Sequence, residues 1–496
     1  MRRAKMPELR CIVPCAAAAL LAACTIGPDY VRPAVDAPAA FRFEVKEAAE
    51  TAGTEWWKEF GDPVLDGLIA EALVNNLNLK VAVANVEQAG GVFTQTRSQL
   101  FPQVGYSASG ERSRATEAGA NAALSRLIPN PQTAYQAALT ASWEIDLWGR
   151  IRRQSEAALA NLLATDDARR GVILSLVTSV AGDYIQLRGL DEQLAISKRT
   201  LGAYGESVKL FQLQFQYGQV SQMNVAQAQS QYETAAAQIP QIESQIAQLE
   251  NSLSILLGRN PGPIARGKSI YDFKLPAVPA GLPSELLERR PDLMQSEQQL
   301  IAANAQIGAA KALYFPTISL TGAFGGASAD LSKLFTGPAR VWSYAGQAIG
   351  PIFTFGSVSG QVAQAEARQQ AALNDYQLSI QNAFADVANA LIANQKLQEQ
   401  LEAQGRLVAA LQDYDRLATL QYNGGYTSYT TVLQAEQSLF PAELTLANLR
   451  AQVFNSNVNI YKTMGGGWVT LADKASAPEA PNAPPLEERA QRVPLF

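Results

Sequence analysis

The sequence contains no histidine, and its three cysteines, Cys11, Cys15 and Cys24, all lie in the first 24 of 496 residues. Histidine is the commonest general base and a common metal ligand. Its absence excludes Ser-His-Asp and Cys-His catalysis and histidine-ligated zinc sites. A net charge of −5 gives no electrostatic case for a nucleic-acid partner. We therefore expect no enzyme, no catalytic residues, no metal site and no bound cofactor.

Long hydrophobic runs are also missing: after residue 24 no stretch approaches 18 uncharged apolar residues, so no transmembrane helix is predicted. The N-terminus has a basic start and then a short apolar stretch, residues 11–23, which suits a signal peptide. The stretch ends Leu21-Ala22-Ala23-Cys24, which resembles a bacterial lipoprotein signal. Residues 1–23 are then a signal peptide and Cys24 carries the lipid; an ordinary signal peptide cut nearby is the alternative. Thr25 follows the cysteine, and by the same resemblance it implies sorting to the outer membrane.

An internal repeat organises the rest of the chain. Residues 79–102 align with 293–316, Trp148-Gly149 with Phe355-Gly356, and residues 218–228 with 425–435. The three landmarks occur in the same order in both halves. One unit is therefore used twice, and each copy is expected to have a helix, two strands and then two helices.

The predicted organisation follows from these landmarks and from the positions of proline. Residues 62–257 form the first repeat, with strands at about 103–112 and 133–145 and a helical hairpin at about 151–257. Residues 292–465 form the second repeat, with strands at about 316–325 and 341–352 and a hairpin at about 361–464. The first helix of the first repeat is expected to run unbroken over 62–99. The remaining segments are a lipid-anchored N-terminal segment (24–61), a proline-rich connector (258–291) and a proline-rich disordered tail (466–496).

The four predicted strands alternate apolar and polar residues, and their lengths are close to the roughly 9–11 residues of a membrane-crossing strand. A half-buried sheet in a soluble domain is the alternative, but it needs an apolar helix face to cover it. The long helices lack proline for 60 residues or so, enough for about 90 Å at 1.5 Å per residue. Each ends at a glycine turn, at Gly218 and at Gly425.

Four strands per chain cannot close a membrane barrel, because an open edge leaves backbone groups unpaired in lipid. Two copies give eight strands, whose interior is filled by side chains, whereas three copies give twelve and leave a passage. The sequence thus predicts an α+β membrane protein. Its homotrimer forms a 12-stranded outer-membrane β-barrel continued by a long periplasmic α-helical barrel.

Several motifs have plainer explanations than a ligand site. Residues 262–269 match the phosphate-loop pattern GxxxxGK[ST], but a helix precedes them and an extended segment follows, so we interpret the match as chance. We interpret residues 289–292 mainly as the cap of the next helix, with an ion-pair cluster as the alternative. Aromatic residues near the helix ends are predicted to pack rather than to bind ligands: Trp56, Trp57, Phe211, Phe215 and Tyr217.

Over residues 24–470 the sequence closely resembles the TolC-like outer-membrane efflux proteins, in their acylated lipoprotein branch typified by OprM and NodT. The specific marks are residues 27–30 (GPDY), 56–63 (WWKEFGDP), 282–292 (LPSELLERRPD) and 465–468 (GGGW). The resemblance implies an exit duct, in the outer membrane of a Gram-negative bacterium and extending into the periplasm. It implies docking to a periplasmic adaptor and an inner-membrane pump of RND type, with drugs or toxic compounds as cargo. Exit ducts for type I protein secretion or metal efflux remain alternatives, as does a lipid-anchored coiled-coil protein without a lumen.

Two sets of residues are candidates for function in such a duct. The glycine turns are predicted to form the periplasmic tips that meet the adaptor, with hydroxyl side chains capping the return helices; this set is Gly218, Val220, Ser221, Gly425, Thr427 and Ser428. In similar proteins carboxylates line a constriction near the second tip. The matching positions here are neutral, namely Thr430, Thr431 and Gln434. Glu436 is expected to face another way, which predicts weak cation preference.

Overall fold

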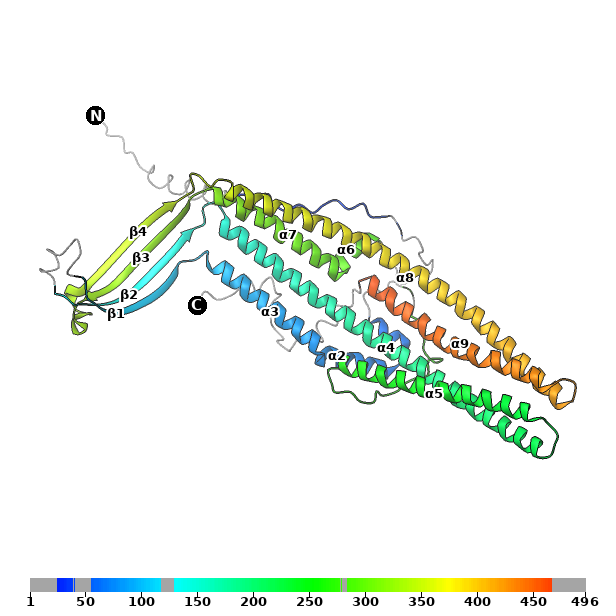
Figure 1. Cartoon of the computed structure of the whole chain (residues 1–496). Helices are drawn as coiled ribbons and strands as arrows, with labels where there is room; N and C mark the ends of the chain where they lie inside the picture. Colours follow the sequence, from blue (N-terminus) through cyan, green and yellow to red (C-terminus); the bar gives the residue numbers. More distant parts are fainter. Residues whose placement is uncertain are drawn as a thin grey trace.

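The computed structural model describes residues 25–38, 40, 55–116, 129–276, 278 and 283–465. The molecule is elongated, with a four-stranded sheet at one end and two helical hairpins reaching away from it (Figure 1). The predicted signal peptide, Cys24 and the C-terminal tail lie outside the described residues. None of the described helices is both long enough and apolar enough to cross a membrane.

The helix–strand–strand–helix–helix order occurs twice. In the first half, α2 (Pro63–Asn75) and α3 (Leu77–Ser98) lead to β1 (Gln103–Ser113), β2 (Gln132–Ile145), α4 (Arg150–Gln216) and α5 (Gln222–Leu256). In the second half, α6 (Leu286–Arg289) and α7 (Pro291–Lys311) lead to β3 (Thr317–Ser328), β4 (Arg340–Ile349), α8 (Ser357–Asn423) and α9 (Tyr429–Thr463). The corresponding long helices have equal lengths, 67 residues in α4 and α8 and 35 in α5 and α9. The equal lengths agree with a duplicated unit.

The first helix is not continuous, and the prediction of one helix over 62–99 was wrong. Asn76 interrupts it with an extended ψ of 127°. Its side-chain oxygen accepts from the Leu79 N–H at 2.9 Å, and its amide donates to the Leu256 carbonyl at 2.8 Å. A buried asparagine that caps one helix and ties it to another offers the backbone an alternative to helical continuation. Strand β4 is also shorter than predicted, because Pro351 cannot donate to a ladder.

The sheet is antiparallel with the order β1-β2-β3-β4, and its register brings the apolar residues of all four strands to one face. One row across the sheet is Tyr106, Leu139, Phe324 and Trp342; the adjacent row on the other face is Gly105, Thr140, Ala323 and Ser343. Within the described chain the sheet stands clear of the helices, and its apolar side chains are exposed, Tyr106 by 87% and Tyr344 by 80% (Figure 1). The sheet is therefore not the covered sheet of a soluble domain. Its presence also excludes the coiled-coil alternative.

The main hydrophobic cluster lies near mid-length, where α2 and the turn before it pack against α4, α5 and α9. Trp56 is fully buried and stacks on Tyr461 at 5.0 Å between ring centroids. Phe60 contacts Trp56 at a centroid distance of 6.1 Å, and the rings of Phe60, Phe273 and Phe454 lie 5.6 to 6.1 Å from one another. The Trp56-Trp57 pair is thus a packing anchor, as predicted from the sequence.

Candidate functional site

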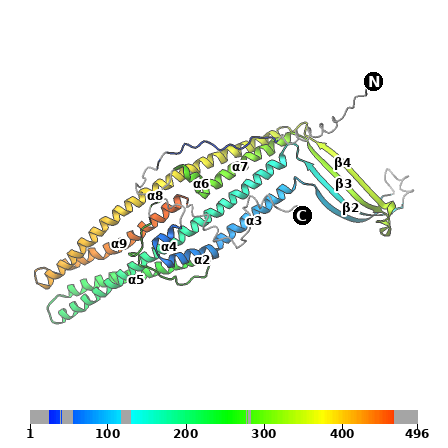
Figure 2. The same ribbon diagram turned by 180° about the vertical axis from the view of Figure 1, so that it is seen from behind.

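The two hairpins end in turns of the same construction, at the end of the molecule farthest from the sheet (Figures 1 and 2). In the first turn the Gln219 N–H donates to the Gln214 carbonyl at 2.8 Å and the Gly218 N–H to Phe215 at 2.9 Å. The second turn repeats both bonds, from Tyr426 to Gln421 and from Gly425 to Tyr422. This pair of bonds is the Schellman motif, which needs a left-handed residue. Gly218 (φ 71°) and Gly425 (φ 76°) supply it.

The return helices begin at Ser221 and Ser428, but the predicted hydroxyl caps are not formed. Neither serine side chain bonds a backbone N–H of the first turn. The Ser221 hydroxyl instead donates to the Asn224 side-chain oxygen at 2.7 Å, and the Thr427 and Thr431 hydroxyls bond each other at 2.8 Å. The serine carbonyls accept the N–H groups three residues on, which satisfies part of each helix start without the side chain.

Aromatic residues divide into a buried and an exposed set at the tips. Phe211 of α4 is buried against Tyr422 of α8 and Tyr429 of α9, with a centroid distance of 4.0 Å to Tyr429. This contact joins the two hairpins. Phe215 and Tyr217, which the sequence predicted to pack, are 45% and 75% exposed. The prediction that these two rings pack was therefore wrong within one protomer. Met223, Leu420 and Tyr426 are also exposed near the tips, so the tips present several apolar side chains to solvent.

The residues predicted at the constriction lie on the first turns of α9. Thr430 and Gln434 are exposed and Thr431 is half-buried. Glu436 lies on another side of α9, where Tyr204 of α4 donates to its carbonyl at 3.3 Å. One Glu436 carboxylate oxygen is buried without a hydrogen-bond partner among the described residues. Burial, with a smaller effect from the Asp415 carboxylate, raises the pKa of Glu436 to about 7.

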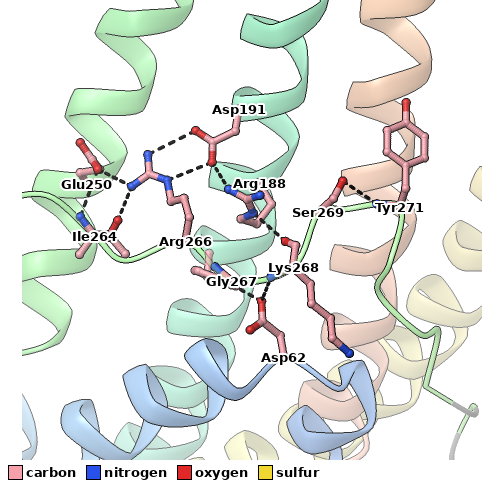
Figure 3. A network of polar contacts seen from close by, with 11 residues as sticks. Asp62, Arg188, Asp191, Glu250, Ile264, Arg266, Gly267, Lys268, Ser269 and Tyr271 are labelled. Carbon is pink, nitrogen blue, oxygen red and sulfur yellow. Dashed lines mark hydrogen bonds and ion pairs between the residues drawn. The ribbon is translucent and has the colours of Figure 1, made fainter.

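The segment that resembles a phosphate loop forms an internal polar network (Figure 3). Asp62, at the start of α2, accepts from the Val64 N–H at 2.9 Å, the Tyr184 hydroxyl at 2.8 Å and the Lys268 N–H at 3.1 Å. Arg266 pairs with both Asp191 of α4 and Glu250 of α5. The loop follows helix α5 rather than a strand, and one of its N–H groups binds a carboxylate of the chain itself. The match to a phosphate loop is therefore coincidental, and the loop ties the connector to three helices.

Replacing Asp62 with alanine is expected to lower the free energy of unfolding by about 2–4 kcal/mol, because it leaves buried donors without their acceptor. Thermal unfolding of the purified protein in detergent measures this change. Asp66→Ala on the same helix is the matched control, since no hydrogen bond of its side chain is lost. Equal melting temperatures for the two variants would contradict the proposed importance of the Asp62 network.

The N-terminal segment, residues 25–38, is held along the helices next to the sheet. The Ile26 N–H donates to the Trp148 carbonyl at 3.2 Å, and Arg153 pairs with Asp29 at 2.7 Å. Asn304 of α7 donates to the Pro28 carbonyl at 2.9 Å. Thr25 packs against Gly149, at the junction of β2 and α4. Thr25, the residue that follows Cys24, therefore lies at the junction between the strands and the helices.

Arg290 forms an ion-pair cluster, so the interpretation of residues 289–292 mainly as a helix cap was incomplete. Pro291 does begin α7, but the Arg290 side chain makes no capping bond. It pairs instead with Asp292 at 2.7 Å and with Asp386 of α8 at 3.1 Å, and it donates to the Thr463 carbonyl at 3.2 Å. Arg290 thereby joins α7, α8 and the end of α9.

The sequence matches the outer membrane efflux protein family over residues 68–259 and 282–466. It is 36% identical over 467 residues to the probable efflux pump outer membrane protein TtgC of Pseudomonas putida, covering 92% of this chain and 95% of TtgC. It is 36% identical over 462 residues to the cation efflux system protein CusC of Escherichia coli K12, covering 92% of this chain and 99% of CusC. The solved open state of the MtrE outer membrane channel of Neisseria gonorrhoeae is similar, with a TM-score of 0.81 and 32% identity over 90% of this chain and 99% of that chain.

Proposed function

The chain belongs to the outer membrane efflux protein family, and from this premise we propose how it works as the outer-membrane exit duct of a tripartite efflux system. Three copies join edge to edge, so that their sheets form one barrel and their hairpins one tube. The observation that carries this proposal is the sheet itself. It has one apolar and one polar face, and β1 and β4 each have a neighbour on one side only within the described chain.

Three copies are the smallest number that both closes the barrel in the membrane and leaves a passage through it. Free strand edges in lipid cost several kcal/mol for each unpaired group, so the edge of β1 is expected to pair with β4 of the next copy. The apolar row that contains Leu139 then faces lipid, and the polar row that contains Thr140 faces the lumen. Eight strands would leave an interior filled by side chains, whereas twelve leave an open passage.

The proposed cargo is small organic molecules, delivered by an adaptor and an inner-membrane pump of RND type. Relatives of similar identity belong to a probable efflux pump and to a cation efflux system, so metal cations and protein secretion remain the alternatives. The test is a strain that lacks its own duct and carries this chain with its matched pump and adaptor. Restored resistance to antibiotics and organic solvents supports the proposal, and restored resistance to metal salts alone would replace it.

The tips are the proposed contact with the adaptor. The exposed rings of Tyr217 (75%) and Tyr426 (88%) flank the two glycine turns, at the end of the chain most distant from the sheet. Exposed apolar patches of this kind mark protein interaction sites. The docking set is Gly218, Val220, Ser221, Gly425, Thr427 and Ser428.

The closed end is proposed to lack an acidic ring, because Thr430, Thr431 and Gln434 are neutral. Single-channel currents should then show weak cation preference and little block by trivalent cations added from the periplasmic side. Gln434→Asp is expected to introduce such block. Strong block of the wild type would assign the constriction to another carboxylate.

Cys24→Ser is expected to abolish labelling by radioactive fatty acid and to leave a longer, unprocessed precursor. The reason is that signal cleavage in lipoproteins depends on the modified cysteine. Cys15→Ser is the matched control, since that residue lies within the predicted signal peptide. Persistent labelling of the Cys24 variant would refute lipidation at this residue.

A further inference from the structure

Two grooves along the helical wall have an uncommon lining. One groove of about 620 Å³ is lined by residues of α4, α5 and α9. Its described lining contains no charged side chain and is dominated by glutamines, which are Gln186, Gln193, Gln238, Gln241, Gln245 and Gln248. A second groove of about 710 Å³ lies nearer the sheet, across α3, α4 and α7. Its described lining is again uncharged and rich in amides, for example Gln88, Gln154 and Asn161.

The first groove opens on the face of the wall opposite to the connector. On α4, Arg188 and Asp191 point to the connector (Figure 3). The Tyr184 hydroxyl, on the same side of α4, donates to Asp62. At 100° per residue, Gln186 and Gln193 point about 160° away from this group. Helix α5 likewise has one side toward the connector and one side toward the groove. Glu250 accepts a hydrogen bond from the Ile264 N–H of the connector, whereas Gln241 and Gln245 line the groove.

In the proposed three-copy duct, one face of the helical wall must line the lumen and the other must face the periplasm. The connector, α2 and the turn before it form a bulky layer on one face, and this layer would obstruct the passage if it lay inside. The amide face is therefore the luminal one. The two grooves span α4 from Gln154 to Gln193, a length of about 60 Å at 1.5 Å per residue.

We propose that the stretch of wall lined by these two grooves does not select solutes by charge and suits neutral and zwitterionic organic solutes rich in hydroxyl, carbonyl and amide groups. The inference rests on the proposed function and names its substrate class. Each side-chain amide donates and accepts hydrogen bonds without carrying charge. A solute can exchange a hydrogen bond to water for one to the wall with little net gain in free energy, which leaves the solute mobile.

Asp183 is the carboxylate that borders this lining on α4. It lies one helical turn from Gln186 and is half-buried. Its carboxylate accepts a hydrogen bond from the hydroxyl of Ser252, a residue of the first groove. Burial raises the pKa of Asp183. Three copies of Asp183 are expected to give the wild type a weak cation preference, and Asp183→Asn is expected to remove it.

The test introduces charge of either sign at Gln241, which is exposed in the groove. Full-length protein in planar bilayers is compared in a potassium chloride gradient. The wild type should have a potassium-to-chloride permeability ratio only slightly above unity; Gln241→Glu should raise it severalfold and Gln241→Lys should lower it below unity. Glu243→Gln, on the opposite side of α5, is the matched control: it changes the charge by one, as Gln241→Lys does, and breaks only an exposed ion pair with Lys198, so the ratio should change little.

The outcomes separate the inference from the proposed function. Conducting channels whose permeability ratio is the same in both Gln241 variants would place the groove outside the lumen and overturn the inference. A strongly selective wild type that Asp183→Asn leaves unchanged would also overturn it. Absence of conductance in every variant, the wild type included, would instead contradict the duct on which the inference rests.

Discussion

Replacing Leu139 with arginine is expected to remove the protein from the outer membrane. Leu139 lies at the middle of β2, on the apolar face, between Tyr106 and Phe324 of the neighbouring strands. An arginine at this depth on a lipid-facing strand costs about 2–4 kcal/mol in each copy, and three copies repeat the cost around one barrel. Outer-membrane fractionation with detection of the trimer on unheated gels measures the effect.

Thr140→Arg is the matched control, because this residue is the next one along the strand and faces the opposite way. Thr140 lies in the polar row with Gly105 and Ala323. An arginine there meets the lumen, so the protein should still reach the membrane as a trimer. Normal insertion of the Leu139 variant together with loss of the Thr140 variant would mean that the face with Thr140, not the face with Leu139, contacts lipid.

Leucine at Gly218 or at Gly425 is expected to abolish export while trimers remain in the membrane. Both glycines have positive φ, and a Cβ at either position meets no atom within 4 Å. The local strain is about 1–2 kcal/mol, too little to unfold a hairpin of this length. The new side chain instead projects from the surface where the adaptor is proposed to dock. Antibiotic susceptibility, measured alongside the amount of trimer, separates the two effects.

Gly202→Leu on α4 is the control for these turn variants. Its Cβ also meets open space, but it lies within the helix and has no positive φ. Export should be normal in this variant. Loss of trimers in the Gly218 and Gly425 variants would mean that the turns only stop helices, and normal export in both would remove them from the docking surface.

Regular patterns of the sequence predicted the architecture well. Alternation with a period of two gave the four strands, and the absence of proline together with the glycine turns gave the long helices to within a few residues. These signals lie in consecutive residues, so they can be read without knowing which segments contact one another in the fold. The break at Asn76 was missed because a single asparagine between two helical patterns carries no strong stop signal. Its effect depends on Leu256, which lies 180 residues away.

The candidate site was less accessible to sequence analysis, because it depends on which helices lie side by side. The abundance of glutamine was visible in the sequence. That residues of α4, α5 and α9 share one uncharged groove is visible only in the structure. The same holds for Arg290, whose partner Asp386 belongs to another helix.

The most direct test of the three-copy duct is to count the copies that join at the sheet edges. The sequence has no cysteine after Cys24, so cysteines placed at Ser107 of β1 and Ser343 of β4 can be joined selectively by a short bismaleimide in intact outer membranes. Both residues lie on the polar face of an edge strand. A three-copy duct gives a ladder of one, two and three copies that ends at three. Protein that remains monomeric, or a ladder that continues beyond three, would contradict it.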